Sequence, residues 1–189
     1  MGAPWLAPPP MLGGLEDVKL SAANTDVSFA VRWLGALVVR GRFTELSGTV
    51  RVPPEGVERA TVRVEVATAS VRTGIALRDR HLREPVFLDA RRFPAIAFRA
   101  DAPRWRGTHL YMPGLLTVRG VEHPCDLTCT FDGAPANGTR ELRASAEATL
   151  RRTDFGVACP VGRLGRDPRF LVISDEVYVR VAVRAAAAR

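Results

Sequence analysis

The chain has 189 residues, 47% of them hydrophobic and 25% charged, which is an ordinary globular composition and excludes a disordered chain. Its formal net charge of +7 would suit a polyanionic partner such as a nucleic acid. Because Lys19 is the only lysine and the arginines are spread along the chain beside abundant alanine, the charge by itself does not indicate a nucleic-acid-binding face.

Residues 1–15 are rich in proline and glycine, which interrupt both strands and helices. We therefore expect a flexible leader followed by a single domain over residues 16–189. The leader lacks the basic start and the apolar run of a secretory signal peptide. No later segment approaches the roughly 18 uninterrupted apolar residues of a membrane-spanning helix. These features predict a soluble protein of the cytoplasm.

From residue 16 onward, apolar and polar residues alternate with a period of two, which predicts strands with one dry face and one wet face. Val62 and Val64, for example, alternate with Arg63 and Glu65. Clusters of proline, glycine, aspartate and asparagine separate the alternating segments. The pattern predicts about eight antiparallel strands, at 27–34, 38–52, 59–72, 96–100, 110–118, 121–131, 140–151 and 176–184.

The alternation stops between Thr73 and Pro85, where the apolar spacing becomes helical and predicts one short helix at about 75–84. The predicted fold class is all-β, an eight-stranded antiparallel barrel carrying this helix. A barrel of this size is either filled by side chains or holds one small ligand. The predicted inner faces use Ala, Val, Thr and Ser more than Leu or Phe, which favours a cavity, although small residues would also let two sheets pack closely.

Several motifs occur in the order in which they occur in a known family. They are FAVRWL at 29–34, GRF at 41–43, SVRTG at 70–74, RDRHL at 78–82, FLD at 87–89, FPAIAF at 93–98, GLLTVRGV at 114–121, RTDFGV at 152–157 and SDEV at 174–177. Through them, the segment from about Asp17 to Ala185 resembles the YceI-like family of lipid-binding barrels.

The resemblance implies an extended, lipocalin-like antiparallel barrel with a helix on it, which binds chains of the polyisoprenoid type in its interior. The sequence departs from the family at Trp33, where histidine is common, so that a polar role there is lost or passes to the indole N–H. The loop 159–170 fits no tight pattern of the family.

Ten apolar residues are predicted to line the interior, where they would hold a prenyl chain by burying its apolar surface. Ordinary core packing is the alternative for each aromatic residue among them. They are Phe29, Val31, Phe43, Val64, Phe98, Leu116, Leu127, Phe131, Leu150 and Phe155.

Arg78, Asp79 and His81 on the predicted helix, together with Arg152, form the best candidate for a polar cluster at one barrel end. Helical spacing turns Asp79 toward the protein, and a buried carboxylate needs hydrogen-bond donors. Two interpretations stay open. The arginines contact a diphosphate or a quinone head group of a ligand, or Asp79 with an arginine or backbone amides holds the helix on the barrel.

The sequence lacks recognised catalytic, metal-binding and cofactor-binding motifs, and its three histidines are dispersed. Cys125, Cys129 and Cys159 lack the spacing of a zinc site, and we expect reduced, buried thiols. We therefore predict a protein that binds or transports a long-chain isoprenoid-type lipid, needs no cofactor and catalyses nothing. Transient contact with a membrane and pairing of two chains stay open.

Two other function classes compete with the carrier. A barrel enzyme acting on a small apolar substrate would require at least two convergent polar groups in the interior, where the pattern offers mainly Thr68, Ser70 and His123. An arginine-rich nucleic-acid-binding protein would require arginines and aromatic residues gathered on one sheet face, whereas the predicted outer faces mix arginine with glutamate and threonine. We therefore expect no nucleic-acid partner.

Overall fold

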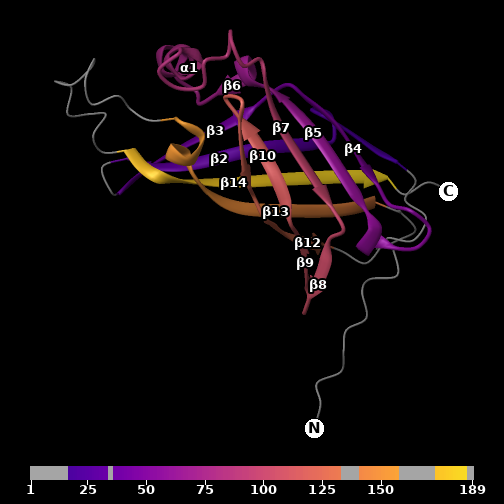
Figure 1. The fold of residues 1–189 in the computed structure, drawn as a ribbon. Helices are drawn as coiled ribbons and strands as arrows, with labels where there is room; N and C mark the ends of the chain where they lie inside the picture. The colour runs from indigo at the N-terminus through magenta and orange to yellow at the C-terminus, as the bar shows by residue number, and fades with distance from the viewer. Residues whose placement is uncertain (1–16, 34–35, 133–140, 158–172, 187–189) are drawn as a thin grey trace.

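The computed structural model describes residues 17–33, 36–132, 141–157 and 173–186. The predicted leader 1–15, Cys159 and the loop 159–170 lie outside these ranges. Within the described residues the fold is all-β with one α-helix, and fourteen strands form two antiparallel sheets. Figure 1 shows β5, β7 and β10 crossing steeply over β13 and β14 of the other sheet.

The smaller sheet has six strands, and neighbours in its order are hydrogen-bonded. Val62 of the third strand lies opposite Val50 on one side and Ala100 on the other. The strands, in spatial order, are β1 (Val18–Ser21), β4 (Leu46–Arg51), β5 (Thr61–Ala67), β7 (Ala95–Asp101), β10 (Gly114–Val118) and β11 (Val121–Pro124).

The larger sheet has eight strands. Its longest ladder joins β13 and β14, from Glu141 opposite Ala186 to Arg151 opposite Glu176. The strands, in spatial order, are β6 (Val71–Arg72), β3 (Leu37–Phe43), β2 (Thr25–Trp33), β14 (Ile173–Ala186), β13 (Glu141–Arg151), β12 (Leu127–Asp132), β9 (His109–Met112) and β8 (Arg104–Arg106).

The prediction of an eight-stranded closed barrel is wrong in strand number and in closure, because neither sheet closes on itself within the described ranges. Four predicted strands, at 38–52, 59–72, 110–118 and 121–131, each contribute one strand to each sheet. The chain crosses between the sheets within each of these segments. Two short strands, β1 and β8, were not predicted.

Hydrogen bonds between backbone groups hold these crossings together. The N–H of Ala67 donates to the carbonyl of Glu45, and the N–H of Thr44 donates to the carbonyl of Ser70. At another crossing, the N–H of Cys125 donates to the carbonyl of Gly114. The two sheets are therefore one continuous wall that bends at its corners, although each ladder ends there.

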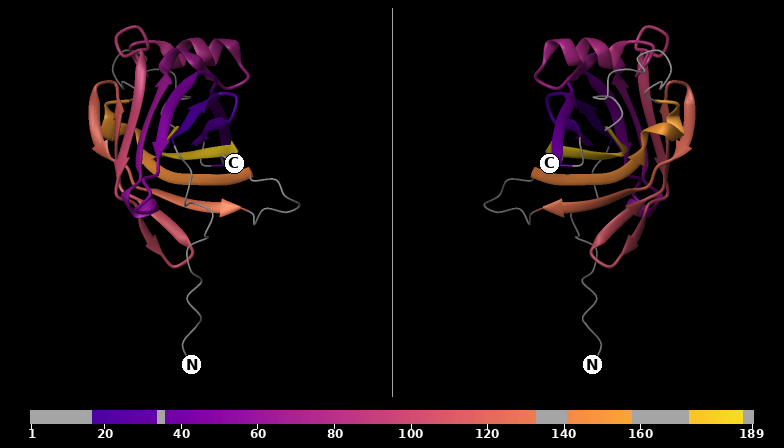
Figure 2. Two further views of the ribbon diagram at one scale, coloured as in Figure 1. Left: turned by 90° about the vertical axis from the view of Figure 1, so that its right-hand side faces the viewer. Right: turned by 90° about the vertical axis from the view of Figure 1, so that its left-hand side faces the viewer.

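The helix α1 (Ala76–Arg83) confirms the prediction of a helix at about 75–84. Pro85 follows its C-cap Glu84 and prevents continuation, because proline cannot donate the next backbone hydrogen bond. The helix lies at one end of the molecule, and β8 with β9 lies at the opposite end (Figure 2).

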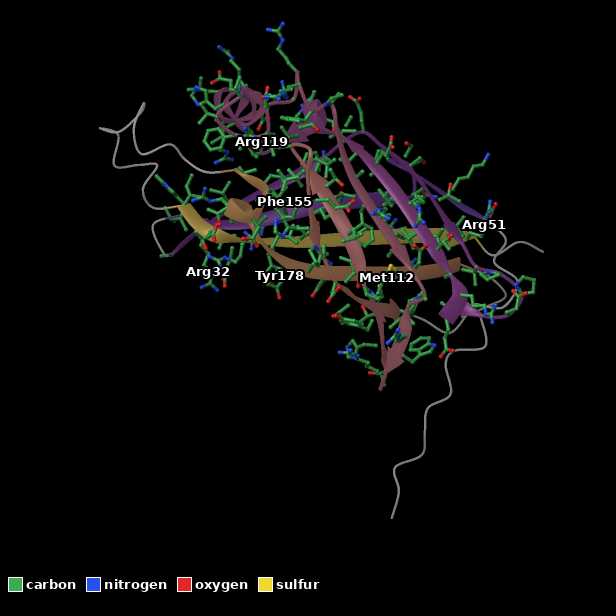
Figure 3. All side chains as sticks on the ribbon, viewed as in Figure 1. Arg32, Arg51, Met112, Arg119, Phe155 and Tyr178 are labelled. Atoms are coloured by element: carbon green, nitrogen blue, oxygen red, sulfur yellow. The ribbon has the colours of Figure 1, made fainter. Side chains whose placement is uncertain are left out.

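The turn after α1 is attached to the hairpin between β10 and β11. Arg119 and Gly120 both have positive φ, as a two-residue type I′ hairpin loop requires. The guanidinium of Arg119 donates to the backbone carbonyl of Phe87, and Phe93 packs where a side chain on Gly120 would lie. Figure 3 shows Arg119 beside the helical end of the molecule.

Candidate functional site

A cavity of about 660 Å³ lies between the two sheets and α1, and its lining is almost entirely apolar. This volume falls within the roughly 300 to 1,000 Å³ that is common for sites of small organic ligands. Strands of both sheets contribute every second residue to the lining, as expected for side chains that alternate across a pleated strand. The interior is therefore a cavity rather than an interlocked core.

All ten residues predicted to line the interior lie on this cavity. Their part in binding a ligand stays a prediction. From the larger sheet come Phe29 and Val31 (β2), Phe43 (β3), Leu127 and Phe131 (β12) and Leu150 (β13). From the smaller sheet come Val64 (β5), Phe98 (β7) and Leu116 (β10), and Phe155 belongs to the short 3₁₀ helix η4 (Arg152–Phe155).

Two of the cavity phenylalanines have ring atoms close against glycines. A Cβ atom added at Gly41 would lie 2.3 Å from Cζ of Phe29, and one added at Gly114 would lie 2.5 Å from Cζ of Phe98. Both distances are far below van der Waals contact, so any side chain at these glycines would displace a ring. The glycines thus keep the two rings against the wall and leave the cavity open.

Part of the wall is closely packed. Leu110, Cys125, Leu127 and Cys129 form a buried cluster, and Trp105 packs against Phe131 with ring centroids 5.9 Å apart. Cys125 and Cys129 are free and buried, as predicted, and burial raises the pKa of each thiol to about 11. The thiols are therefore protonated at neutral pH and are poor nucleophiles.

Sequence reasoning missed several lining residues. Trp33, Ile96 and Met112 continue the inward alternation of their strands, so a longer count of the same pattern would have found them. Phe87 and Leu88 lie in the turn after α1, which has no period from which an inward side chain can be predicted. The alternating valines of β14, at 177, 179, 181 and 183, line the cavity as their dry face indicated.

Of the predicted polar cluster, Arg78, His81 and Arg152 lie on the cavity and Asp79 does not. Asp79 is buried but turns to the loop before α1, where its Oδ1 accepts hydrogen bonds from the N–H and the hydroxyl of Thr73. Arg78 adds to this cluster, because its Nε donates to Oγ1 of Thr73 at 2.7 Å and its Nη2 donates to the Thr73 carbonyl at 2.8 Å. Asp79 therefore holds the N-terminal end of α1 on the sheets.

The electrostatic surroundings keep Asp79 ionised. Burial raises the pKa of its carboxyl group, but the two Thr73 hydrogen bonds and the charges of Arg83 and Arg72 lower it more, so the pKa lies below its ordinary value of 3.8. Of the two interpretations that the sequence left open, this geometry fits Asp79 as an anchor of the helix.

Arg152 also has mainly structural contacts. Its Nη1 donates to the carbonyl of Val157 at 2.7 Å and its Nε to the carbonyl of Ser174 at 3.2 Å, so it ties η4 to the start of β14. The imidazole of His81, by contrast, has no hydrogen bond to any described residue, and Nη1 of Arg78 is also without one. Both groups belong to residues that line the cavity.

The other polar candidates lie elsewhere. Thr68 and Ser70 are buried in the 3₁₀ helix η3 (Thr68–Ser70) and do not line the cavity, and Ser70 donates to the carbonyl of Ala67. The ring of His123 packs edge-on against Phe155. Within the described ranges, no group of three or more His, Cys, Asp and Glu side chains could hold a metal ion.

The sequence profile of the YceI-like domain matches residues 19–185. The chain belongs to the YceI-like domain family. Protein YceI of Salmonella arizonae is 30% identical to this YceI-like domain over 152 residues, which are 79% of each chain. The family resemblance predicted from the motifs is thus confirmed.

Solved structures share the fold of this YceI-like domain. Burkholderia cenocepacia BcnA matches with a TM-score of 0.74 at 18% identity, over 87% of this chain and 98% of that one. A polyisoprenoid-binding domain from Saccharophagus degradans matches with a TM-score of 0.66 at 15% identity, over 92% of this chain and 99% of that one. None of the described helices has the length and apolar composition needed to span a bilayer.

Substituting Gly114→Ala should lower the free energy of unfolding by about 1 to 3 kcal/mol, because the new methyl group overlaps the ring of Phe98. Urea denaturation measures the change. The double variant Gly114→Ala with Phe98→Leu is the matched control, since the smaller side chain removes the overlap with the ring and should regain part of the loss, while the close contact with the Arg99 carbonyl oxygen remains. Equal stability of Gly114→Ala and the unsubstituted protein would show that the ring does not depend on the glycine.

Substituting Asp79→Ala should lower the free energy of unfolding by about 2 kcal/mol, because it leaves the Thr73 donors without their acceptor. The lowered pKa also predicts a pH dependence. The carboxylate stabilises the fold fully above its ordinary pKa of 3.8, and this contribution disappears as pH falls through the folded-state pKa below that value. Urea denaturation across this range should show a steeper acid loss for the unsubstituted protein than for Asp79→Asn. Parallel curves would contradict the prediction.

Proposed function

We propose that this YceI-like domain binds a long-chain isoprenoid-type lipid, such as a polyprenyl chain or a quinone tail, in its apolar cavity and acts as a carrier without catalysis. The observation that carries the proposal is the cavity itself, about 660 Å³ in volume and lined by side chains of both sheets. An apolar space of this size inside a protein loses dispersion contacts unless an apolar molecule fills it. A flexible hydrocarbon chain is the ligand that matches such a lining.

The likeness in fold to the polyisoprenoid-binding domain from Saccharophagus degradans supports an isoprenoid over other apolar ligands. Branched isoprene units also suit a wall of valines and phenylalanines, because their methyl groups fill the spaces between β-branched side chains. Most of the affinity would come from apolar burial at about 25 cal/mol per Å², reduced by the cost of ordering the chain.

The polar end of the ligand would lie near α1. His81 and Arg78 line the cavity, and the imidazole and Nη1 have no hydrogen bonds to the described residues, so they are the groups we assign to the lipid head group. One imidazole and one guanidinium N–H suit a single oxygen or a small anionic group. Asp79 and Arg152 would act indirectly, by holding α1 and η4 at this end of the cavity.

The absence of catalysis is part of the proposal. The thiols of Cys125 and Cys129 have raised pKa values, and Asp79 is engaged with Thr73 away from the cavity. An enzyme acting on a small apolar substrate remains the second candidate, and His81 beside Arg78 would be its polar pair. Turnover of a bound lipid by the purified protein, lost in His81→Ala, would favour that candidate. The cytoplasmic location expected from the sequence stays a prediction.

Replacing Val64 or Ala146 by tryptophan should abolish lipid retention, because both residues line the cavity and an indole would occupy much of it. Native mass spectrometry of the purified protein, followed by lipid extraction, measures retention of a long-chain lipid. Thr149→Trp is the matched control, since Thr149 is exposed on the same strand as Ala146. The proposal fails if both cavity variants fold and keep as much lipid as the control.

Binding of a fluorescent prenyl probe should change little with ionic strength, because salt barely screens apolar burial. Nucleic-acid binding would instead weaken by orders of magnitude between low and moderate salt. Several surface arginines are in ion pairs, such as Arg99 with Glu122 and Arg63 with Asp101, which supports the carrier over an arginine-rich nucleic-acid-binding protein. Tight, saturable DNA binding at physiological salt without probe uptake would overturn the proposal.

A further inference from the structure

The N-terminal end of α1 carries two exposed aliphatic side chains. Ile75 is 53% exposed and Leu77 is 57% exposed, and these are among the most exposed large hydrophobic residues that the structure describes. Both also line the cavity. They therefore form an apolar path from the molecular surface into the cavity, at the end of the molecule where α1 lies (Figure 2).

Helix stability does not account for Ile75. This residue is the N-cap of α1, and its side chain forms no capping hydrogen bond. Serine, threonine, aspartate or asparagine at an N-cap would accept a hydrogen bond from a free backbone N–H, whereas isoleucine is among the poorest N-cap residues. Exposure to water disfavours the same side chain. An apolar environment outside the chain would explain its presence.

A pair of arginines lies on β3 and β6, and β6 contacts α1. Arg42 of β3 and Arg72 of β6 are directly opposite each other in the ladder, both exposed, and Arg72 precedes Ile75 by three residues. Like charges directly opposite in an antiparallel pair destabilise it. Neither is in an ion pair with a carboxylate among the described residues, although Asp79 attracts Arg72 at longer range. An external anion would relieve their repulsion.

We propose that Ile75, Leu77, Arg42 and Arg72 form a docking rim through which the protein contacts an anionic phospholipid bilayer and takes up or releases its lipid. The inference rests on the proposed function and adds to it the surface from which the ligand arrives. Ile75 and Leu77 enter the boundary between head groups and acyl chains, and the arginines meet lipid phosphates. The isoprenoid then passes between bilayer and cavity without crossing water.

The rim makes transfer salt-dependent while retention stays salt-independent. Electrostatic attraction to an anionic surface is screened by salt, whereas the apolar contacts of a lipid inside the cavity are not. Uptake of a fluorescent prenyl lipid should therefore be faster from phosphatidylglycerol vesicles than from phosphatidylcholine vesicles, and the difference should shrink as salt rises. The uptake rate is followed by the change in probe fluorescence after mixing protein with loaded vesicles.

The double variant Ile75→Ser with Leu77→Ser should lower binding to phosphatidylglycerol vesicles on the order of tenfold, through lost apolar burial. Its melting temperature should change little, because serine is a better N-cap residue than isoleucine at position 75 and this gain offsets the lower helix propensity of serine at position 77. Tyr178→Ser is the matched control, since Tyr178 is 56% exposed but lies on the outer face of the larger sheet, away from α1 (Figure 3).

The double variant Arg42→Gln with Arg72→Gln tests the charges. Each arginine contributes about fivefold to binding at an anionic surface, so vesicle binding should fall about 25-fold. Arg59→Gln with Arg104→Gln changes the net charge equally at exposed arginines away from the rim and should have a much smaller effect. The two arginine variants, whose residues do not line the cavity, should retain the prenyl probe when it is supplied in detergent.

The two proposals fail separately. Full probe retention in the unsubstituted protein and the arginine variants, with vesicle binding and transfer unaffected by the rim substitutions or by lipid charge, would overturn the docking rim and leave the carrier intact. Failure of the unsubstituted protein to retain any prenyl lipid would overturn the carrier and the rim together. Equal losses from the rim pair and from Arg59→Gln with Arg104→Gln would show general charge attraction and would also overturn the rim.

Discussion

The two sheets face each other across a cavity, and the other features of the fold depend on this separation. Side chains that do not reach an opposite layer lose the dispersion contacts that hold an ordinary sandwich together. The wall must therefore be stable without them. Long antiparallel ladders such as β13 with β14 supply part of that stability, and the backbone hydrogen bonds at the corners, such as Ala67 to Glu45, supply another part.

The helix α1 is likewise held in place by hydrogen bonds of polar groups around an apolar interior. Asp79 accepts two hydrogen bonds from Thr73, and Arg119 donates to the turn after the helix. Thr73, Asp79 and Arg119 do not line the cavity, so they fix α1 and its following turn without filling the space beneath the helix. A helix held through its core face would have needed large side chains where the cavity now lies.

The alternation of apolar and polar residues predicted the lining residues of the cavity well and the strand topology poorly, for one physical reason. Inward alternation depends only on where the apolar interior lies, and it continues from Leu110 to Val118 although the chain changes sheets near Pro113. Alternation therefore identified lining residues but not strand ends. In 38–52 the inward-facing residues change from odd numbers, such as Phe43, to even numbers, such as Val50, and this break marks a crossing that the sequence could have revealed. Asp79 was correctly expected to be buried, but its partner Thr73 lies on a loop whose course no pattern encodes.

Gly41 and Gly114 have a consequence for how this family can change. Neither glycine has a positive φ, so their backbone conformation would accept other residues, and neighbouring atoms forbid them instead. These atoms belong to the Phe29 ring at Gly41, and to the Phe98 ring and the Arg99 carbonyl at Gly114. A substitution behind a ring would move that ring inward and shorten the space for a hydrocarbon chain. The length of chain that the protein accommodates is therefore governed partly by residues that the chain never touches. Relatives could therefore differ in the length of the ligand they bind through substitutions at residues behind the rings, while the residues that contact the ligand stay the same.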